Sequence, residues 1–107
     1  MARTYRQGDE AIIAELAATK SAVTRLLTVT NPDWLMEVWS LIHRHPRRVA
    51  ASVYPRKGGV RATETLGAIA ANRATELTCR KRGDELAAST YARIVELCIE
   101  KLPYWAR

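Results

Sequence analysis

Six cationic side chains occur in a stretch of the chain that contains no acidic residue. The stretch lies between Glu37 and Glu64, and its formal charge of +6 equals the net charge of the whole 107-residue chain. A block of this kind is typical of a surface that neutralises phosphate groups. A solvated basic face without a ligand is the alternative interpretation. The candidate nucleic-acid-binding residues are Arg44, Arg47, Arg48, Arg56, Lys57 and Arg61.

Two glycines, Gly58 and Gly59, follow Arg56 and Lys57 in a segment with the composition of a loop. A loop with two cations at the start of a helix can hold a phosphate through backbone amides and charge. The Walker pattern is absent, because it requires a lysine after the glycines followed by serine or threonine. Nucleotide hydrolysis is therefore not expected. An ordinary surface loop between two helices is the other interpretation.

The histidines and cysteines do not favour metal binding or catalysis. His43 and His45 are two residues apart, so they do not share a helix face, and no nearby cysteine or carboxylate completes a metal shell. Cys79 and Cys98 fall in helical patterns without a local histidine. We interpret them as reduced thiols of a cytoplasmic protein rather than as a disulfide. We expect no cofactor, no metal and no enzymatic activity.

Three aromatic residues each have two interpretations. Tyr54 lies inside the basic stretch, where its ring could stack on a nucleobase or pack the loop against the rest of the protein. Tyr104 and Trp105, near the end of the chain, either dock onto a partner or cover one end of the helices.

The elements that position these residues are predicted to be helices. Apolar residues recur at helical spacing, strand patterns are weak, and the chain contains no Phe. The pattern predicts an all-α protein, a compact bundle of four to five helices that forms a single domain over residues 1–107. The expected helices cover residues 9–28, 31–44, 47–54, 60–82 and 84–101.

Local signals mark several helix ends. Asn31 is a suitable N-cap and Pro32 fits the first helical position. His45 precedes Pro46 and is biased away from helical geometry, and Gly83 is a plausible C-terminal stop. The predicted core consists of Ile12, Leu16, Val23, Leu27, Leu35, Val38, Ile42, Leu66, Ile69, Leu77, Tyr91, Ile94, Val95 and Cys98.

Residues 13–27 also contain a weak helix-turn-helix pattern, with its turn at Ala18-Thr19. Such turns often contain glycine, and this one has none, while the alanines around it favour uninterrupted helix. We therefore predict one continuous helix over 9–28. A helix-turn-helix-like DNA-binding regulator is kept as an alternative function.

Four segments together carry a resemblance to a known family. They are His45-Pro46-Arg47-Arg48-Val49, Gly58-Gly59, Thr63-Glu64-Thr65-Leu66-Gly67-Ala68-Ile69-Ala70 and Leu102-Pro103-Tyr104-Trp105. The chain resembles the small subunits of multi-subunit CRISPR ribonucleoprotein effector complexes. The resemblance implies a short, basic, helical protein without catalytic residues, stacked along the complex with its basic faces toward guide RNA and target backbone. The basic positions from 44 to 61 are the matching candidates.

These observations lead to one expected function and to an alternative function of a different class. We expect a non-enzymatic cytoplasmic subunit that binds the backbone of RNA or single-stranded DNA together with other protein subunits. No apolar run approaches the roughly 20 residues of a membrane span, and Met1–Gly8 lacks the pattern of a signal peptide. The second interpretation is a small phage- or plasmid-type interaction or inhibitor module whose basic face docks onto an acidic protein.

Overall fold

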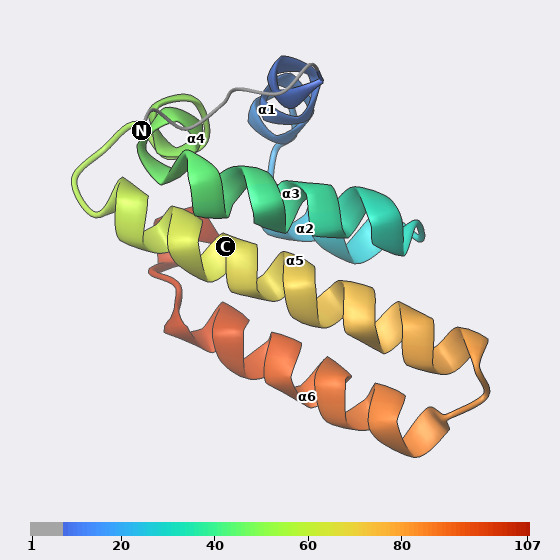
Figure 1. Cartoon of the computed structure of the whole chain (residues 1–107). Helices are drawn as coiled ribbons and strands as arrows, with labels where there is room; N and C mark the ends of the chain where they lie inside the picture. Colours follow the sequence, from blue (N-terminus) through green and yellow to red (C-terminus); the bar gives the residue numbers. More distant parts are fainter. Residues whose placement is uncertain (1–7) are drawn as a thin grey trace.

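All regular structure in the part of the chain that is described, residues 8–107 of a computed structural model, is helical (Figure 1). This confirms the all-α class. Six α-helices lie in that range, so the predicted four to five was too few. The elements are α1 (Asp9–Ala18), α2 (Ala22–Thr28), α3 (Pro32–Arg44), α4 (Pro46–Val53), α5 (Gly59–Lys81), α6 (Glu85–Lys101) and a 3-10 helix at Tyr104–Ala106.

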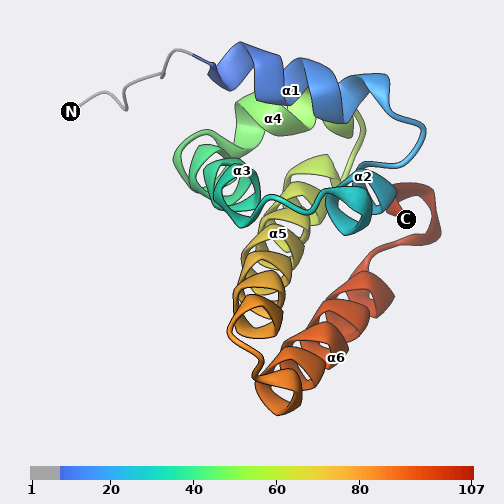
Figure 2. The same cartoon turned by 90° about the vertical axis from the view of Figure 1, so that its right-hand side faces the viewer.

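The long helix α5 is the centre of the fold. It contacts α2, α3, α4 and α6, whereas α1 packs on α4 and α2 (Figures 1 and 2). Gly67 lets α3 approach α5 closely, because a Cβ atom at this position would lie 3.0 Å from Cγ2 of Ile42. The helices α3 and α4, which carry three of the six cationic candidates, are therefore both supported by α5.

The predicted continuous helix over 9–28 was wrong. The chain leaves helical geometry at Thr19, which is extended (φ −84°, ψ 151°), and α2 begins after Ser21. The Oγ atom of Ser21 caps α2 by accepting a hydrogen bond from the Thr24 N–H at 3.2 Å. Serine favours such caps because its side chain competes with helical backbone bonding. The break falls where the helix-turn-helix pattern placed its turn.

The other predicted helix ends agree closely with the structure. The Asn31 side chain accepts a hydrogen bond from the Asp33 N–H at 3.0 Å, and Pro32 is the first residue of α3. The helix α3 ends at Arg44, two residues before Pro46. Gly83 adopts a positive φ of 81° after α5, as expected for a helix stop. Side-chain capping and proline geometry therefore fixed these boundaries locally.

The core differs from the prediction at residues whose neighbours depend on packing. The side chain of Leu27 is 38% exposed, and Leu26 is buried in its place, because the break before Ser21 reorients α2. Tyr91 and Ile94 are only half-buried. The largest fully buried side chains are Leu16, Leu26, Leu35, Leu41, Leu66, Ile69, Leu102, Val38, Val49 and Thr63.

The helices α5 and α6 form an antiparallel hairpin that extends away from α1–α4 (Figure 2). Its far part is weakly covered, and the side chain of Leu86 is 83% exposed. Cys79 and Cys98 are half-buried free thiols on the two helices. None of the helices in residues 8–107 is both long and apolar enough to cross a membrane.

Candidate nucleic-acid interface

The six cationic candidates occupy two different environments in the structure. Arg44 and Arg48 face helix α1, where both form ion pairs. Arg56, Lys57 and Arg61 lie in or just after the turn that joins α4 to α5. The fold thus divides a block that is continuous in sequence into two groups with different roles.

Arg44 holds α1 against the end of α3. Its Nη1 atom lies 3.1 Å from Oδ2 of Asp9, and its Nη2 atom lies 3.2 Å from Oδ1. Only 4% of the Asp9 side chain and 17% of the Arg44 side chain are exposed. A bidentate pair this deeply buried is a structural contact, because removing either partner takes a charge-assisted interaction from a side chain that water hardly reaches.

Arg48 forms a similar but exposed pair with α1. Its Nη2 atom lies 3.0 and 3.2 Å from the two carboxylate oxygens of Glu10, and its Nη1 donates to Oγ of Ser52 at 2.9 Å. Water reaches both side chains of the pair, so it contributes little to stability. Arg48 therefore stays accessible to an external anion.

Arg47 lies between these two arginines in sequence, but its side chain is exposed on α4. No ion pair within residues 8–107 engages it. It lines a shallow surface hollow together with Arg44, His45, Pro46 and Arg48. Arg47 is thus the member of this group whose charge is available.

The turn between α4 and α5 is held by aromatic contacts. The Tyr54 hydroxyl donates a hydrogen bond to the carbonyl of Ala106 at 2.8 Å, and its ring meets Trp105 edge-on at 5.8 Å between centroids. Burial raises the pKa of Tyr54 to about 12. Because only 8% of Tyr54 is exposed, it packs the turn rather than offering a stacking surface. Arg56 lies over the ring of Trp105, with its guanidinium carbon 4.2 Å from the ring centroid.

Two glycines give the turn its shape. Gly58 has a φ of +83°, a conformation that residues with a side chain rarely adopt. Gly59 approaches the backbone of Tyr54 so closely that a Cβ atom would lie 1.9 Å from the Tyr54 carbonyl oxygen. The Gly59 N–H donates to the carbonyl of Arg56 at 2.9 Å. The glycines predicted as loop residues therefore set the position of Lys57 and of the first turn of α5.

The turn opens onto a hollow of about 420 Å³ between the start of α5 and the end of α6. Arg61, Thr65, Lys101 and Trp105 contribute to its lining. Sequence reasoning missed Lys101, which lies next to an acidic residue at the far end of the chain. Only the packing of α6 on α5 brings it to Arg61. We call Arg56, Lys57, Arg61 and Lys101 the turn cluster.

The described residues contain no group of three or more His, Cys, Asp or Glu side chains that could hold a metal ion. His43 stacks on Trp39 on the exposed side of α3. No family model, curated protein or solved structure matches the chain.

Proposed function

We propose that the chain is a non-enzymatic subunit that binds the backbone of RNA or single-stranded DNA. The observation that carries this proposal is the turn cluster. Arg61 and Lys101 line one hollow from α5 and from the end of α6, Arg56 lies over Trp105, which also lines it, and Lys57 lies in the adjoining turn. Within residues 8–107 none of the four takes part in an ion pair.

Cations arranged in this way suit a chain of phosphates. Each neutralised phosphate releases condensed counterions, so the affinity falls steeply as salt rises. Contacts to phosphate position a protein on nucleic acid without reading its sequence. The turn is held by Tyr54 and Trp105, so the cations are presented on a defined backbone. Arg47 adds a further exposed cation on α4.

The contacts of the six candidates guide our proposal of binding residues. Arg44 belongs to the contact with α1, so its main role is in the fold. Arg47 and the turn cluster are the residues that we propose for phosphate binding, with Arg48 beside them. The ribonucleoprotein complex and its other protein subunits stay a prediction from the sequence resemblance.

A charge-reversal experiment tests the proposal. The variant Lys57→Glu/Arg61→Glu changes the turn, and Lys81→Glu/Arg82→Glu makes the same charge change at the exposed tip of the α5–α6 hairpin. Fluorescence anisotropy with unrelated RNA, single-stranded DNA and duplex DNA would be measured at low and physiological salt. We expect the turn variant to lose affinity by at least about tenfold, because two phosphate contacts become repulsive. The tip variant should bind like the wild type.

Three results would contradict the proposal. Equal losses in the two variants would mean that net charge alone drives binding. Absence of binding at low salt would indicate that the basic surface binds an acidic protein instead of nucleic acid. A pull-down that is insensitive to nuclease would then identify that protein. A footprint on one discrete duplex sequence would favour the helix-turn-helix-like regulator. Thermal unfolding of both variants should match the wild type, since all four positions are exposed.

A further inference from the structure

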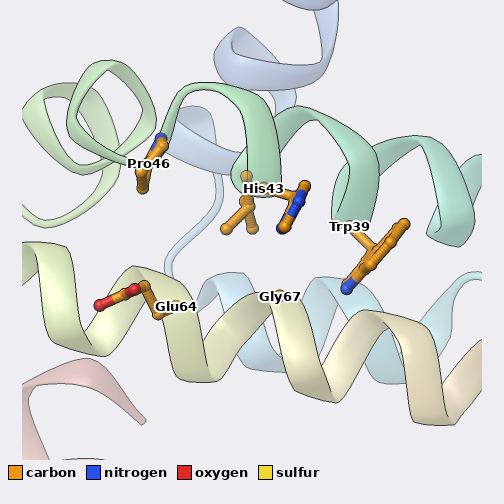
Figure 3. Close-up of a pocket in the computed structure, with 6 residues that line it drawn as sticks. Trp39, His43, Pro46, Glu64 and Gly67 are labelled. Atoms are coloured by element: carbon orange, nitrogen blue, oxygen red, sulfur yellow. The ribbon is translucent and has the colours of Figure 1, made fainter.

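A second, smaller hollow lies between α3 and α5 (Figure 3). Its volume is about 140 Å³, well below the roughly 300–1,000 Å³ of sites for drug-sized ligands. Trp39 and His43 project into it from α3, Glu64 and Gly67 border it on α5, and Pro46 closes one end. The space suits a single ring system rather than a peptide helix.

Two aromatic rings form one wall of this hollow. Trp39 and His43 are one helical turn apart, and their rings are stacked with centroids 5.4 Å apart and an interplanar angle of 13°. The side chain of Trp39 is 39% exposed, and His43 is exposed as well. Parallel, accessible aromatic rings form a platform on which another flat ring can stack.

A hydrogen-bond acceptor borders the hollow on α5 at its Pro46 end, with its side chain directed away from the two rings (Figure 3). Glu64 is exposed, and within the described residues no ion pair engages its carboxylate. An ionised carboxylate accepts hydrogen bonds through two oxygens and donates none. Guanine presents two neighbouring donors, N1–H and the N2 amino group, on an edge that is free only when the base is unpaired. Uracil has a single donor on that edge, so a carboxylate favours guanine over uracil.

The charges around the hollow distinguish a nucleotide from a cationic ligand. Arg47 directly follows Pro46 in α4, and Arg61 lies one turn before Glu64 in α5. Phosphates on either side of a seated base would therefore meet positive charge. A lysine or arginine side chain entering the same hollow would meet one carboxylate and two nearby cations, which makes it the less favourable occupant.

We propose that the hollow lined by Trp39, His43 and Glu64 receives one unpaired guanine base of a single-stranded nucleic acid whose backbone follows the basic surface. This inference rests on the proposed function and adds to it a preference for single strands and for one base. Trp39 and His43 supply stacking, and Glu64 supplies the hydrogen-bond acceptor. Gly67 lets α3 and α5 approach closely enough to form the hollow.

The test compares oligouridine with the same oligonucleotide carrying one central guanosine. Binding to the full-length protein would be followed by anisotropy and by quenching of tryptophan fluorescence. The wild type should bind the guanosine oligonucleotide roughly tenfold more tightly, in line with a good two-point base contact. Trp39→Leu should lower its affinity by about tenfold and remove most of the quenching. Glu64→Gln should remove the guanine preference while quenching persists.

Met36→Ala provides a matched control. Met36 is an exposed apolar residue of α3, 41% exposed, and it does not line the hollow. This variant should keep the wild-type affinity, base preference and quenching. A circular-dichroism melt of each variant separates loss of the site from loss of the fold.

The outcomes distinguish this inference from the proposed function. Salt-sensitive binding that is unchanged by Trp39→Leu and Glu64→Gln would overturn the base site and leave backbone binding intact. Absence of any oligonucleotide binding would overturn both. Quenching by a lysine-rich peptide but not by oligonucleotides, lost in Glu64→Gln, would overturn both proposals in favour of a cationic partner.

Discussion

The contact of α1 with α3 and α4 and the turn between α4 and α5 use arginine in opposite ways. In the first region a buried arginine holds the helices together, through the pair Arg44–Asp9. Aromatic contacts of Tyr54 and Trp105 hold the second region, and none of its cations forms an ion pair within residues 8–107. A basic residue is available to a ligand only where other interactions already stabilise the backbone that carries it.

The largest effect should come from breaking the buried ion pair. Arg44→Ala removes the bidentate ion pair with the buried carboxylate of Asp9, and we expect the free energy of unfolding to fall by about 3 kcal/mol. Urea unfolding at pH 7 measures this loss. The neighbouring Arg47→Ala should change the same quantity by less than about 0.5 kcal/mol, because Arg47 is exposed. Similar losses in the two variants would remove the distinction between the two groups of arginines.

The contribution of the turn to the free energy of unfolding should instead depend on alkaline pH. The pKa of Tyr54 is about 12 in the folded protein, against the ordinary value of 10.0. The unfolded chain therefore releases this proton first, and the free energy of unfolding should fall as pH rises from 10 to 12, by about 2–3 kcal/mol. Below pH 10 this contribution is fully present. Chemical denaturation at a series of pH values measures the slope.

Two phenylalanine variants isolate the contribution of Tyr54. Tyr54→Phe loses its hydrogen bond to Ala106, which should cost about 1 kcal/mol at neutral pH, and the decline between pH 10 and 12 should become shallower. Tyr104→Phe should keep the wild-type slope, since Tyr104 is 86% exposed. An equal slope in the wild type and in Tyr54→Phe would show that the phenol does not stabilise the turn in this way.

The smallest effect should come from the exposed ion pair. Arg48→Ala should lower the free energy of unfolding by no more than about 1 kcal/mol, because water screens both charges of the pair with Glu10. A double-mutant cycle with Glu10→Ala gives the interaction energy. This interaction energy should decrease further in 1 M salt, whereas the interaction energy between Arg44 and Asp9 should largely persist. A salt-insensitive Arg48–Glu10 coupling would argue that this pair also holds the fold.

Much of the fold was readable because its signals are local. Asn31-Pro32, His45-Pro46 and Gly83 act within one helical turn of their own positions, and each marks a boundary that the structure has. The break at Thr19-Lys20-Ser21 was missed because the alanines around it favour helix. Recognition of Ser21 as a cap bonded to the Thr24 N–H would have found it.

The surface was harder to predict from the sequence, because its charged residues interact with residues that are distant in the chain. Nothing near Arg44 in sequence indicates that Asp9 neutralises it, and nothing near Arg61 indicates that Lys101 lies across the same hollow. Trp39 lies on α3, and the hollow that it lines together with α5 depends on the close packing at Gly67. These contacts are consequences of tertiary structure.

The hairpin of α5 and α6 has a consequence for hydrogen exchange. Near its tip, around Gly83, the two helices are covered mainly by each other, and the surrounding side chains are exposed (Figure 2). Opening this end requires less free energy than global unfolding, so its amide protons should exchange faster than those near Leu66 and Ile69. Because the turn cluster lies at the other end of α5, the tip can open and close repeatedly while the turn cluster stays assembled.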